Sequence, residues 1–142
     1  MARPKIGELE LVSRALARLC ADPGIQACAN VPVLGRCVDL VYLRDSRLFT
    51  FEFKIRDWRR AIQQARDHRL AGDYAYVCTP KRAVSPAMRA ALLRNGIGLA
   101  FCCDDRDEPF EIAIEAPKSN DTWSVARSAL VRYITEHHRS TL

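Results

Sequence analysis

Two acidic residues and a lysine within one short stretch are the side chains best able to do chemistry. Residues 36–55 read RCVDLVYLRDSRLFTFEFKI, with Asp39 near the start and Glu52 and Lys54 near the end. Two apolar runs flank the polar cluster 44–47, which predicts a β-hairpin. If residues 45 and 46 form a two-residue turn, Asp39 lies directly opposite Glu52, whereas a longer turn would slide the two apart.

Two carboxylates that face each other across a hairpin need a compensating charge. Facing residues of an antiparallel pair have β-carbons about 4.5 to 5.5 Å apart, so like charges there repel. A divalent cation is the simplest compensation, because such ions prefer carboxylate oxygens as ligands. With the two-residue turn, the hairpin therefore predicts a metal site between Asp39 and Glu52.

The second strand of this hairpin alternates cleanly between two faces. One face carries large apolar side chains: Phe49, Phe51, Phe53 and Ile55. The other face carries Leu48, Thr50, Glu52 and Lys54. Lys54 is therefore predicted to point the same way as Glu52, and the phenylalanine face needs a helix to pack against.

Length and composition predict one globular domain covering residues 1–142. No apolar run approaches the 18 or so residues of a membrane span, and the N-terminal stretch is charged, so we expect a soluble, cytoplasmic protein without a membrane partner. Six cysteines include no C-x-x-C pair and mostly lie in apolar runs. They are interpreted as small buried side chains in a reducing compartment, with a structural zinc or iron–sulfur site as the alternative.

Positive charge is concentrated in the first three quarters of the chain. Residues 1–103 hold 17 Lys and Arg against 9 Asp and Glu, whereas residues 104–142 hold 5 against 8. A polyanion such as nucleic acid is the natural partner for this distribution. Many basic surfaces are only solvated, so the charge by itself does not define a function.

The remaining patterns predict the elements that must position these residues. Helical periodicity covers residues 6–20, 58–71, 86–94 and a segment opening at 121 or 122, and strand patterns cover 25–33, 73–79, 97–103 and 110–115. Asp57 and Ser85 are expected N-caps. On the first helix, Glu8 falls among apolar positions. The last helix should turn inward Trp123, Ala126, Leu130, Tyr133 and Ile134. This order predicts an α/β fold with a mixed central sheet flanked by helices.

The combination of these elements and residues resembles the PD-(D/E)xK nuclease superfamily, in the style of archaeal Holliday-junction resolvases. The resemblance covers about residues 6–80 and rests on Glu8, Asp39, Glu52-Phe53-Lys54 and Gln64. It implies a restriction-endonuclease-like core of order αβββαβ, followed here by an αββα extension. One departure is Val38, which stands where the name motif has proline.

The resemblance implies a Mg²⁺- or Mn²⁺-dependent phosphodiesterase. Asp39, Glu52 and the backbone carbonyl of Phe53 would bind the ion, and Glu8 would hold it through water or bind a second ion. Such an ion stabilises charge on the phosphate and acidifies a water. Lys54 would orient the nucleophile, stabilise developing charge or act as a base, and Gln64 would hold the water or a phosphate.

Basic residues around this centre are candidates for contacts to nucleic acid. They are Arg56, Arg59, Arg60, Arg66, His68 and Arg69. For His68 the alternative is a helix residue near the sheet edge, and for each arginine it is a solvated helix face. Trp58 and Trp123 are interpreted as core or interface residues. A homodimer stays an option, but the resemblance to the dimeric Holliday-junction resolvases is not close enough to imply one.

These observations predict a metal-dependent DNA endonuclease acting in repair, recombination or defence. The first alternative is a nucleic-acid-binding module, or a nuclease subunit, that keeps this fold without cleaving. The second is an α/β protein whose charged strand is merely surface. The DNA structure that is cut does not follow from any motif in the sequence.

Overall fold

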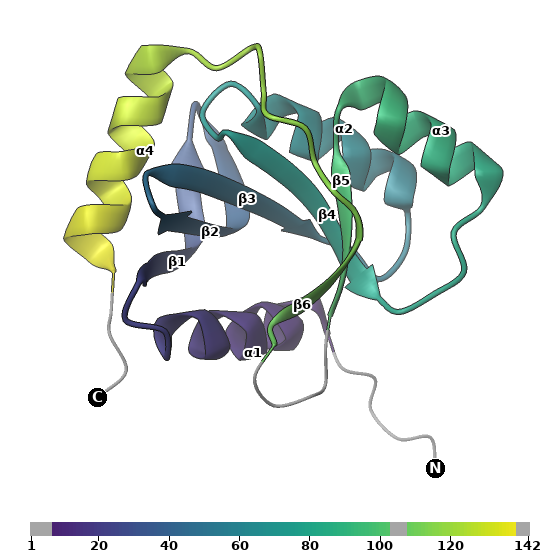
Figure 1. The fold of residues 1–142 in the computed structure, drawn as a ribbon, viewed down its shortest axis with the longest axis horizontal. Helices are drawn as coiled ribbons and strands as arrows, with labels where there is room; N and C mark the ends of the chain where they lie inside the picture. The colour runs from purple at the N-terminus through teal and green to yellow at the C-terminus, as the bar shows by residue number, and fades with distance from the viewer. Residues whose placement is uncertain (1–6, 103–107, 139–142) are drawn as a thin grey trace.

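The computed structural model describes residues 7–102 and 108–138 (Figure 1). Its elements are α1 (Glu8–Cys20), β1 (Ile25–Val33), β2 (Arg36–Arg44), β3 (Arg47–Phe53), α2 (Trp58–His68), β4 (Tyr74–Pro80), α3 (Pro86–Asn95), β5 (Gly98–Cys102), β6 (Phe110–Ile114) and α4 (Ser124–His137). All the predicted elements are present in the predicted order. Helix α2 ends three residues earlier than expected and α4 begins later. Residue 6, Cys103 and most of the turn after it lie outside the described residues.

In the described part of the chain, six strands form one sheet in the order β1-β2-β3-β4-β5-β6. Strands β1, β2 and β3 pair antiparallel, β3 with β4 and β4 with β5 pair parallel, and β6 returns antiparallel to β5. Helices α2 and α3 are the crossovers that parallel neighbours require. The mixed α/β architecture predicted from the sequence is therefore confirmed.

Helices cover both faces of the sheet (Figure 1). Helix α1 packs on the phenylalanine face of β3, where Phe51 and Phe53 are each 1% exposed and contact apolar residues of α1 such as Val12 and Ala15. Helices α2, α3 and α4 pack on the opposite face. The expected helix over the phenylalanines is thus α1, and the face carrying Glu52 lies beneath α2.

The hairpin between β2 and β3 has the predicted two-residue turn. Arg44 pairs with Arg47, and the register continues to Leu40 opposite Phe51. Asp45 and Ser46 have φ angles of 49° and 63°, the left-handed conformation at both central positions that defines a type I′ turn. The register on which the Asp39–Glu52 prediction depended is therefore confirmed.

Capping residues predicted from the sequence begin the two crossover helices. The Asp57 side chain accepts a hydrogen bond from the amide of Arg60, and the Ser85 side chain accepts one from the amide of Met88. Gly96 ends α3 at φ 67°, a left-handed conformation that glycine adopts without strain. These caps fix where α2 starts relative to the end of β3.

A buried ion pair fastens α4 to the hairpin. Asp73, 6% exposed, accepts hydrogen bonds from the Leu48 amide at 2.9 Å and from Arg127 Nη2 at 2.8 Å. Arg127 also donates to the carbonyl of Ser46 in the turn. Burial by itself raises the pKa of Asp73, but the hydrogen bonds from Arg127 and Leu48 outweigh it and lower the pKa. The hairpin that carries the acidic pair is thereby held at its turn end.

Trp123 is exposed, although it was predicted to face inward on α4. It is 51% exposed because α4 begins at the next residue, Ser124, and the buried side of α4 is formed by Ala126, Leu130 and Ile134.

The described cysteines are mostly buried, as expected for small apolar side chains. Cys20, Cys28 and Cys78 are buried, whereas Cys37 is exposed.

Among the described residues, no helix is both long and apolar enough to cross a membrane.

Candidate active site

The acidic, lysine and glutamine side chains predicted to act together line one cleft of about 400 Å³ beside the end of β3. The cleft lies where β2, β3, α2 and the first turn of α1 meet. Its lining is Glu8, Arg36, Cys37, Asp39, Glu52, Phe53, Lys54, Gln64 and His68. Residues from four segments of the sequence thus reach a single depression.

Asp39 occupies a point where regular strand pairing stops. The β2–β3 ladder is regular to Leu40–Phe51, and beyond it the amide of Phe53 donates to Asp39 Oδ2 at 2.8 Å. On the other side, Asn30 has φ 54° and interrupts the pairing of β1 with β2. The Asp39 side chain therefore replaces a backbone acceptor, and this bond fixes its carboxylate next to Glu52.

The environment of Asp39 favours its protonated form. Burial is the main cause that raises the pKa of Asp39 to about 6, and the charge and hydrogen-bonding contact of Glu52 and the charge of Glu8 add to it. The Phe53 amide opposes the rise by stabilising the carboxylate. The cleft therefore disfavours a second charged carboxylate beside Glu52, first through burial and then through the repulsion predicted for two opposed acids.

Glu52 is held by a histidine from α2. Glu52 is 5% exposed and His68 is 3% exposed, and His68 Nε2 lies 2.9 Å from Glu52 Oε2. Because a carboxylate only accepts, the hydrogen on His68 Nε2 points at Glu52. The structure places His68 in the wall of the cleft, not on the surface where a contact to DNA was expected, since a side chain this buried cannot reach a phosphate outside.

Lys54 and Glu8 are joined through the backbone that follows β3. The Lys54 amide donates to the carbonyl of Cys78 at 2.9 Å, which ties the segment to β4. The next amide, of Ile55, donates to Glu8 Oε2 at 2.9 Å. Glu8 therefore anchors the first turn of α1 to the segment that carries Lys54, and this contact explains a carboxylate on the packing side of the helix.

Gln64 presents an unsatisfied acceptor to the same region. Its Oε1 is buried and makes no hydrogen bond within the part of the chain that the structure describes. An unpaired buried polar atom costs roughly 1 to 3 kcal/mol, so such an atom is a natural partner for a water or ligand donor. Its place on α2, one turn before His68, brings it to the wall of the cleft.

The donor set suits a hard divalent cation only in part. Asp39 and Glu52 supply carboxylate oxygens, and their excess negative charge favours a cation. Among residues 7–102 and 108–138, however, no group of three His, Cys, Asp or Glu side chains could hold a metal. A cation here would draw its other ligands from a backbone carbonyl and from water, which Mg²⁺ commonly retains.

Cys37 does not extend the donor set. Its thiol lies at the rim of the cleft, and burial followed by the charges of Asp39 and Glu52 raises its pKa. A hard cation such as Mg²⁺ takes oxygen ligands in preference to the sulfur of a thiol. Cys37 shares the strand parity of Asp39, which is the signal by which the sequence could have placed it here.

Comparison with solved structures identifies the fold. A repair endonuclease from Pyrococcus abyssi matches 70% of this chain and 48% of its own length, with a TM-score of 0.52 and 14% identity. This chain has a restriction-endonuclease-like fold. Can2 from Sulfobacillus thermosulfidooxidans, solved in complex with cyclic tetra-adenylate, matches 89% of the chain and 35% of its own length, with a TM-score of 0.50 and 17% identity. The chain thus spans about half of the endonuclease and a third of Can2. No protein-family model and no curated protein sequence matches it.

On this nuclease-like fold, the basic residues predicted to contact nucleic acid separate into two groups. Arg59 and Arg60 are exposed near the cleft in a neighbouring depression, and Arg66 is exposed further along α2. The side chain of Arg69 is only 15% exposed and binds the carbonyl of Asn95 and the carboxylate of Asp121. Arg69 therefore holds two loops together, which differs from the expected role in nucleic-acid binding.

Arg36 was missed by the sequence reasoning. It lines the cleft and forms an exposed ion pair with Asp67 of α2, with Nε and Oδ2 3.3 Å apart. Arg56 is exposed, just after the segment that carries Lys54. Arg36 is the first residue of β2, and it meets Asp67 of α2 only in the folded chain. No local pattern in the sequence therefore indicated that Arg36 lies in the cleft.

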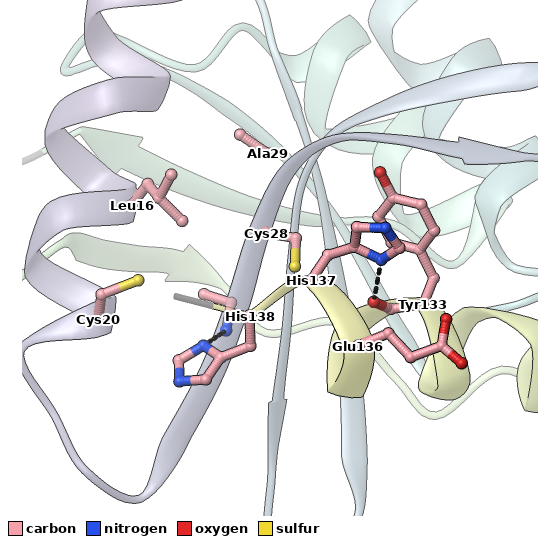
Figure 2. Close-up of a pocket in the computed structure, with 9 residues that line it drawn as sticks. Leu16, Cys20, Cys28, Ala29, Tyr133, Glu136, His137 and His138 are labelled. Atoms are coloured by element: carbon pink, nitrogen blue, oxygen red, sulfur yellow. Dashed lines mark hydrogen bonds between the residues drawn. The ribbon is translucent and has the colours of Figure 1, made fainter. Parts of the chain in front are cut away.

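A second hollow, of about 480 Å³, lies between α1, β1 and the end of α4 (Figure 2). Cys20, Cys28 and two histidines line it, but among the described residues no such group is arranged to hold a metal. His138 Nδ1 accepts from the Ala27 amide at 3.1 Å, and His137 stacks on Tyr133 with ring centroids 4.0 Å apart. His138 therefore fastens the end of α4 to β1, whereas His137 packs against its own helix.

Proposed function

We propose that this protein is a metal-dependent deoxyribonuclease that cleaves DNA internally by hydrolysis, in DNA repair, recombination or defence. The observation that supports it is the meeting of Asp39, Glu52 and Lys54 in one cleft of a nuclease-like fold. The fold by itself does not define a reaction. Opposed acids beside a lysine are the groups that phosphodiester hydrolysis requires.

Mg²⁺ or Mn²⁺ is the proposed cofactor. Asp39 and Glu52 would hold it through their carboxylates and Phe53 through its backbone carbonyl, and Glu8 would contribute through a water or to a second ion. When bound, such an ion polarises the phosphate and acidifies a coordinated water. The raised pKa of Asp39 supports this role, because a bound cation would offset both the burial of the charged carboxylate, which is the main cause of the rise, and the repulsion from Glu52 and Glu8.

The other cleft residues act on the water and the phosphate. The ammonium group of Lys54 places positive charge where negative charge develops on the phosphate, and it orients the attacking water. Gln64 accepts a hydrogen bond from that water through its unpaired Oε1. His68 donates to Glu52 and keeps the carboxylate in place.

Arginines around the cleft account for the choice of a polyanionic substrate. Four of them are exposed: Arg36 lines the cleft, Arg59 and Arg60 line the neighbouring depression, and Arg56 lies two residues after Lys54. Contacts from such residues to phosphates position a strand without reading its sequence, and the resulting affinity falls as salt rises. We propose that residues 1–142 form a single nuclease domain.

A binding module that does not cleave is the second candidate. The small number of metal donors favours this candidate. The described residues supply two closely placed carboxylates and no third, and Glu8 already accepts a hydrogen bond from the Ile55 amide. Such a module would bind nucleic acid through the same arginines. It would depend on a partner for any hydrolysis.

The decisive experiment compares wild type, Asp39→Asn and Lys54→Ala on labelled linear, branched and single-stranded DNA, in Mg²⁺, in Mn²⁺ and in EDTA. Lys81→Ala is the matched control, because Lys81 is exposed and lies outside the cleft. We expect metal-dependent cutting by wild type and the control, and at least about a 100-fold loss in the two cleft variants. Cutting that survives both substitutions would overturn the site assignment. No cutting of any substrate by wild type would favour the binding module.

A further inference from the structure

A groove of about 530 Å³ runs between α2 and α3, which pack side by side (Figure 1). Three exposed arginines line it: Arg59 and Arg66 from α2 and Arg94 from α3. Among the residues that the structure describes, no acidic side chain lines this groove. Its charge is therefore complementary to an anion, and more than one phosphate is needed to match three guanidinium groups.

Small apolar side chains form a strip along the α3 side of this groove. The strip consists of Ala87, Ala90 and Ala91, and Ile62 of α2 is buried opposite them. On α3 the groove residues fall at positions 87, 90, 91 and 94, which is one face of a helix. The ligand that matches arginines beside an apolar strip carries regular negative charge and flat apolar groups together.

Arg59 is held in place on the groove wall. Its guanidinium carbon lies 4.3 Å from the ring centroid of Trp58, a cation–π contact that limits its side-chain freedom. A guanidinium positioned in this way loses less entropy when it binds a phosphate. The wall nearest the cleft is therefore partly pre-organised for an anion.

The groove is connected to the candidate active site. It shares Arg59 and Gln63 with a depression along α2, and that depression shares Arg36 and Gln64 with the cleft of Asp39 and Glu52. The 11 residues of α2 span about 16 Å. A strand in stacked duplex form rises about 3.4 Å per nucleotide, so an unstacked and more extended strand fits fewer than about five nucleotides along this distance.

We propose that the α2–α3 groove binds a single-stranded segment of nucleic acid that is continuous with the strand in the cleft. Phosphates contact Arg59, Arg66 and Arg94, and unstacked bases lie against the alanine strip of α3, which paired bases of a duplex cannot reach. The inference rests on the proposed function in one respect, that the cleft holds the same strand. It assigns a role to Arg94 and to the alanine strip, and it makes a single-stranded flank part of the substrate.

Binding without cleavage tests this inference. Fluorescence anisotropy in EDTA would follow fluorescein-labelled single strands of about 20 nucleotides, since sites of this kind cover about 4 to 16. Wild type is compared with Arg94→Ala and with the pair Arg66→Ala and Arg94→Ala. The matched control is Arg89→Ala, because Arg89 is exposed on α3 but outside the groove.

We expect Arg94→Ala to weaken binding about five- to tenfold at low salt. The double variant should reduce the slope of log affinity against log salt by about 1.4, which is about 0.7 for each lost phosphate contact. Arg89→Ala should bind like wild type. All these side chains are exposed, so melting temperatures should be unchanged. A duplex of the same length should lose less affinity than the single strand.

Three results would overturn the inference. Equal losses in Arg94→Ala and Arg89→Ala would mean a general charge effect, and no loss in either would mean that the groove is unused. Displacement of the strand by polyglutamate at equal charge as readily as by unlabelled DNA would assign the groove to an acidic peptide.

The cleavage assay separates this inference from the proposed function. If wild type cuts DNA and the groove variants bind normally, only the groove assignment fails. If the groove variants lose binding as expected but wild type cuts no substrate in any metal, the nuclease proposal fails and the groove assignment stands.

Discussion

Replacing Asp39 with asparagine tests the electrostatics of the cleft apart from any cleavage. The change removes one of two neighbouring carboxylates, while the asparagine oxygen can still accept the hydrogen bond from the Phe53 amide. Burial, with the added charges of Glu52 and Glu8, raises the pKa of Asp39 from 3.8 to about 6. The folded protein therefore binds this proton more tightly than the unfolded chain does, and ionised Asp39 costs stability above pH 6.

The size of that cost follows from the pKa. A rise of about two pKa units corresponds to roughly 3 kcal/mol, and because Asp39 is only partly buried, we expect about 1 to 2 kcal/mol after screening by solvent. Asp39→Asn should therefore be more stable than wild type by this amount at pH 8 without metal. The advantage should shrink as pH falls through 6 and disappear below 3.8, where the wild-type carboxyl is protonated in both states.

Denaturant unfolding at pH 8 and pH 4, with EDTA and with Mg²⁺ or Mn²⁺, measures these differences. A bound cation should stabilise wild type and not Asp39→Asn, so saturating metal should reduce or reverse the order of stability at pH 8. Glu115→Gln, at an exposed carboxylate away from the cleft, is the control and should change stability by less than about 0.5 kcal/mol. A variant less stable than wild type at pH 8 in EDTA, or an advantage of equal size at both pH values, would refute the reasoning.

Three further substitutions test the supports of the cleft and the sheet. His68→Ala leaves the buried Glu52 oxygen without its donor, and we expect a loss of about 1 to 3 kcal/mol together with weaker Mn²⁺ binding in a titration; unchanged metal affinity would contradict a role in positioning Glu52. Asp73→Asn breaks the pair with Arg127 and should lower the unfolding free energy by up to about 3 kcal/mol. Because the pKa of Asp73 is lowered, this difference should be present at pH 7 and vanish as acid protonates the wild-type carboxylate; a difference that persists in acid would rule out the ion pair as its cause. Phe51→Ala empties a site that is 1% exposed, between Tyr76 and Phe110, and should cost about 3 to 5 kcal/mol in denaturant unfolding, whereas a cost below 1 would mean that the site collapses.

The hairpin shows which structural features the sequence patterns predicted and which they did not. The alternation of β3 and the polar turn at residues 45 and 46 predicted both the register and the face that meets α1, because strand period and turn length are local properties. The bond from the Phe53 amide to Asp39 was not predicted. It exists because regular pairing stops beyond Leu40 and Phe51, where the Asp39 side chain takes over as acceptor, and no local pattern records that interruption.

The sequence by itself determined the order of the elements, the caps at Asp57 and Ser85, the opposed acids, and the presence of Lys54 on the face of Glu52. Each depends on residues close together in the chain, whose spacing sets their geometry. Only the tertiary structure decided that His68 is buried against Glu52, that Arg69 ties two loops together, and that Arg94 joins the arginines of α2 in a groove. Helical periodicity says which residues share a face but not which element that face will meet, and burial or exposure follows from that meeting.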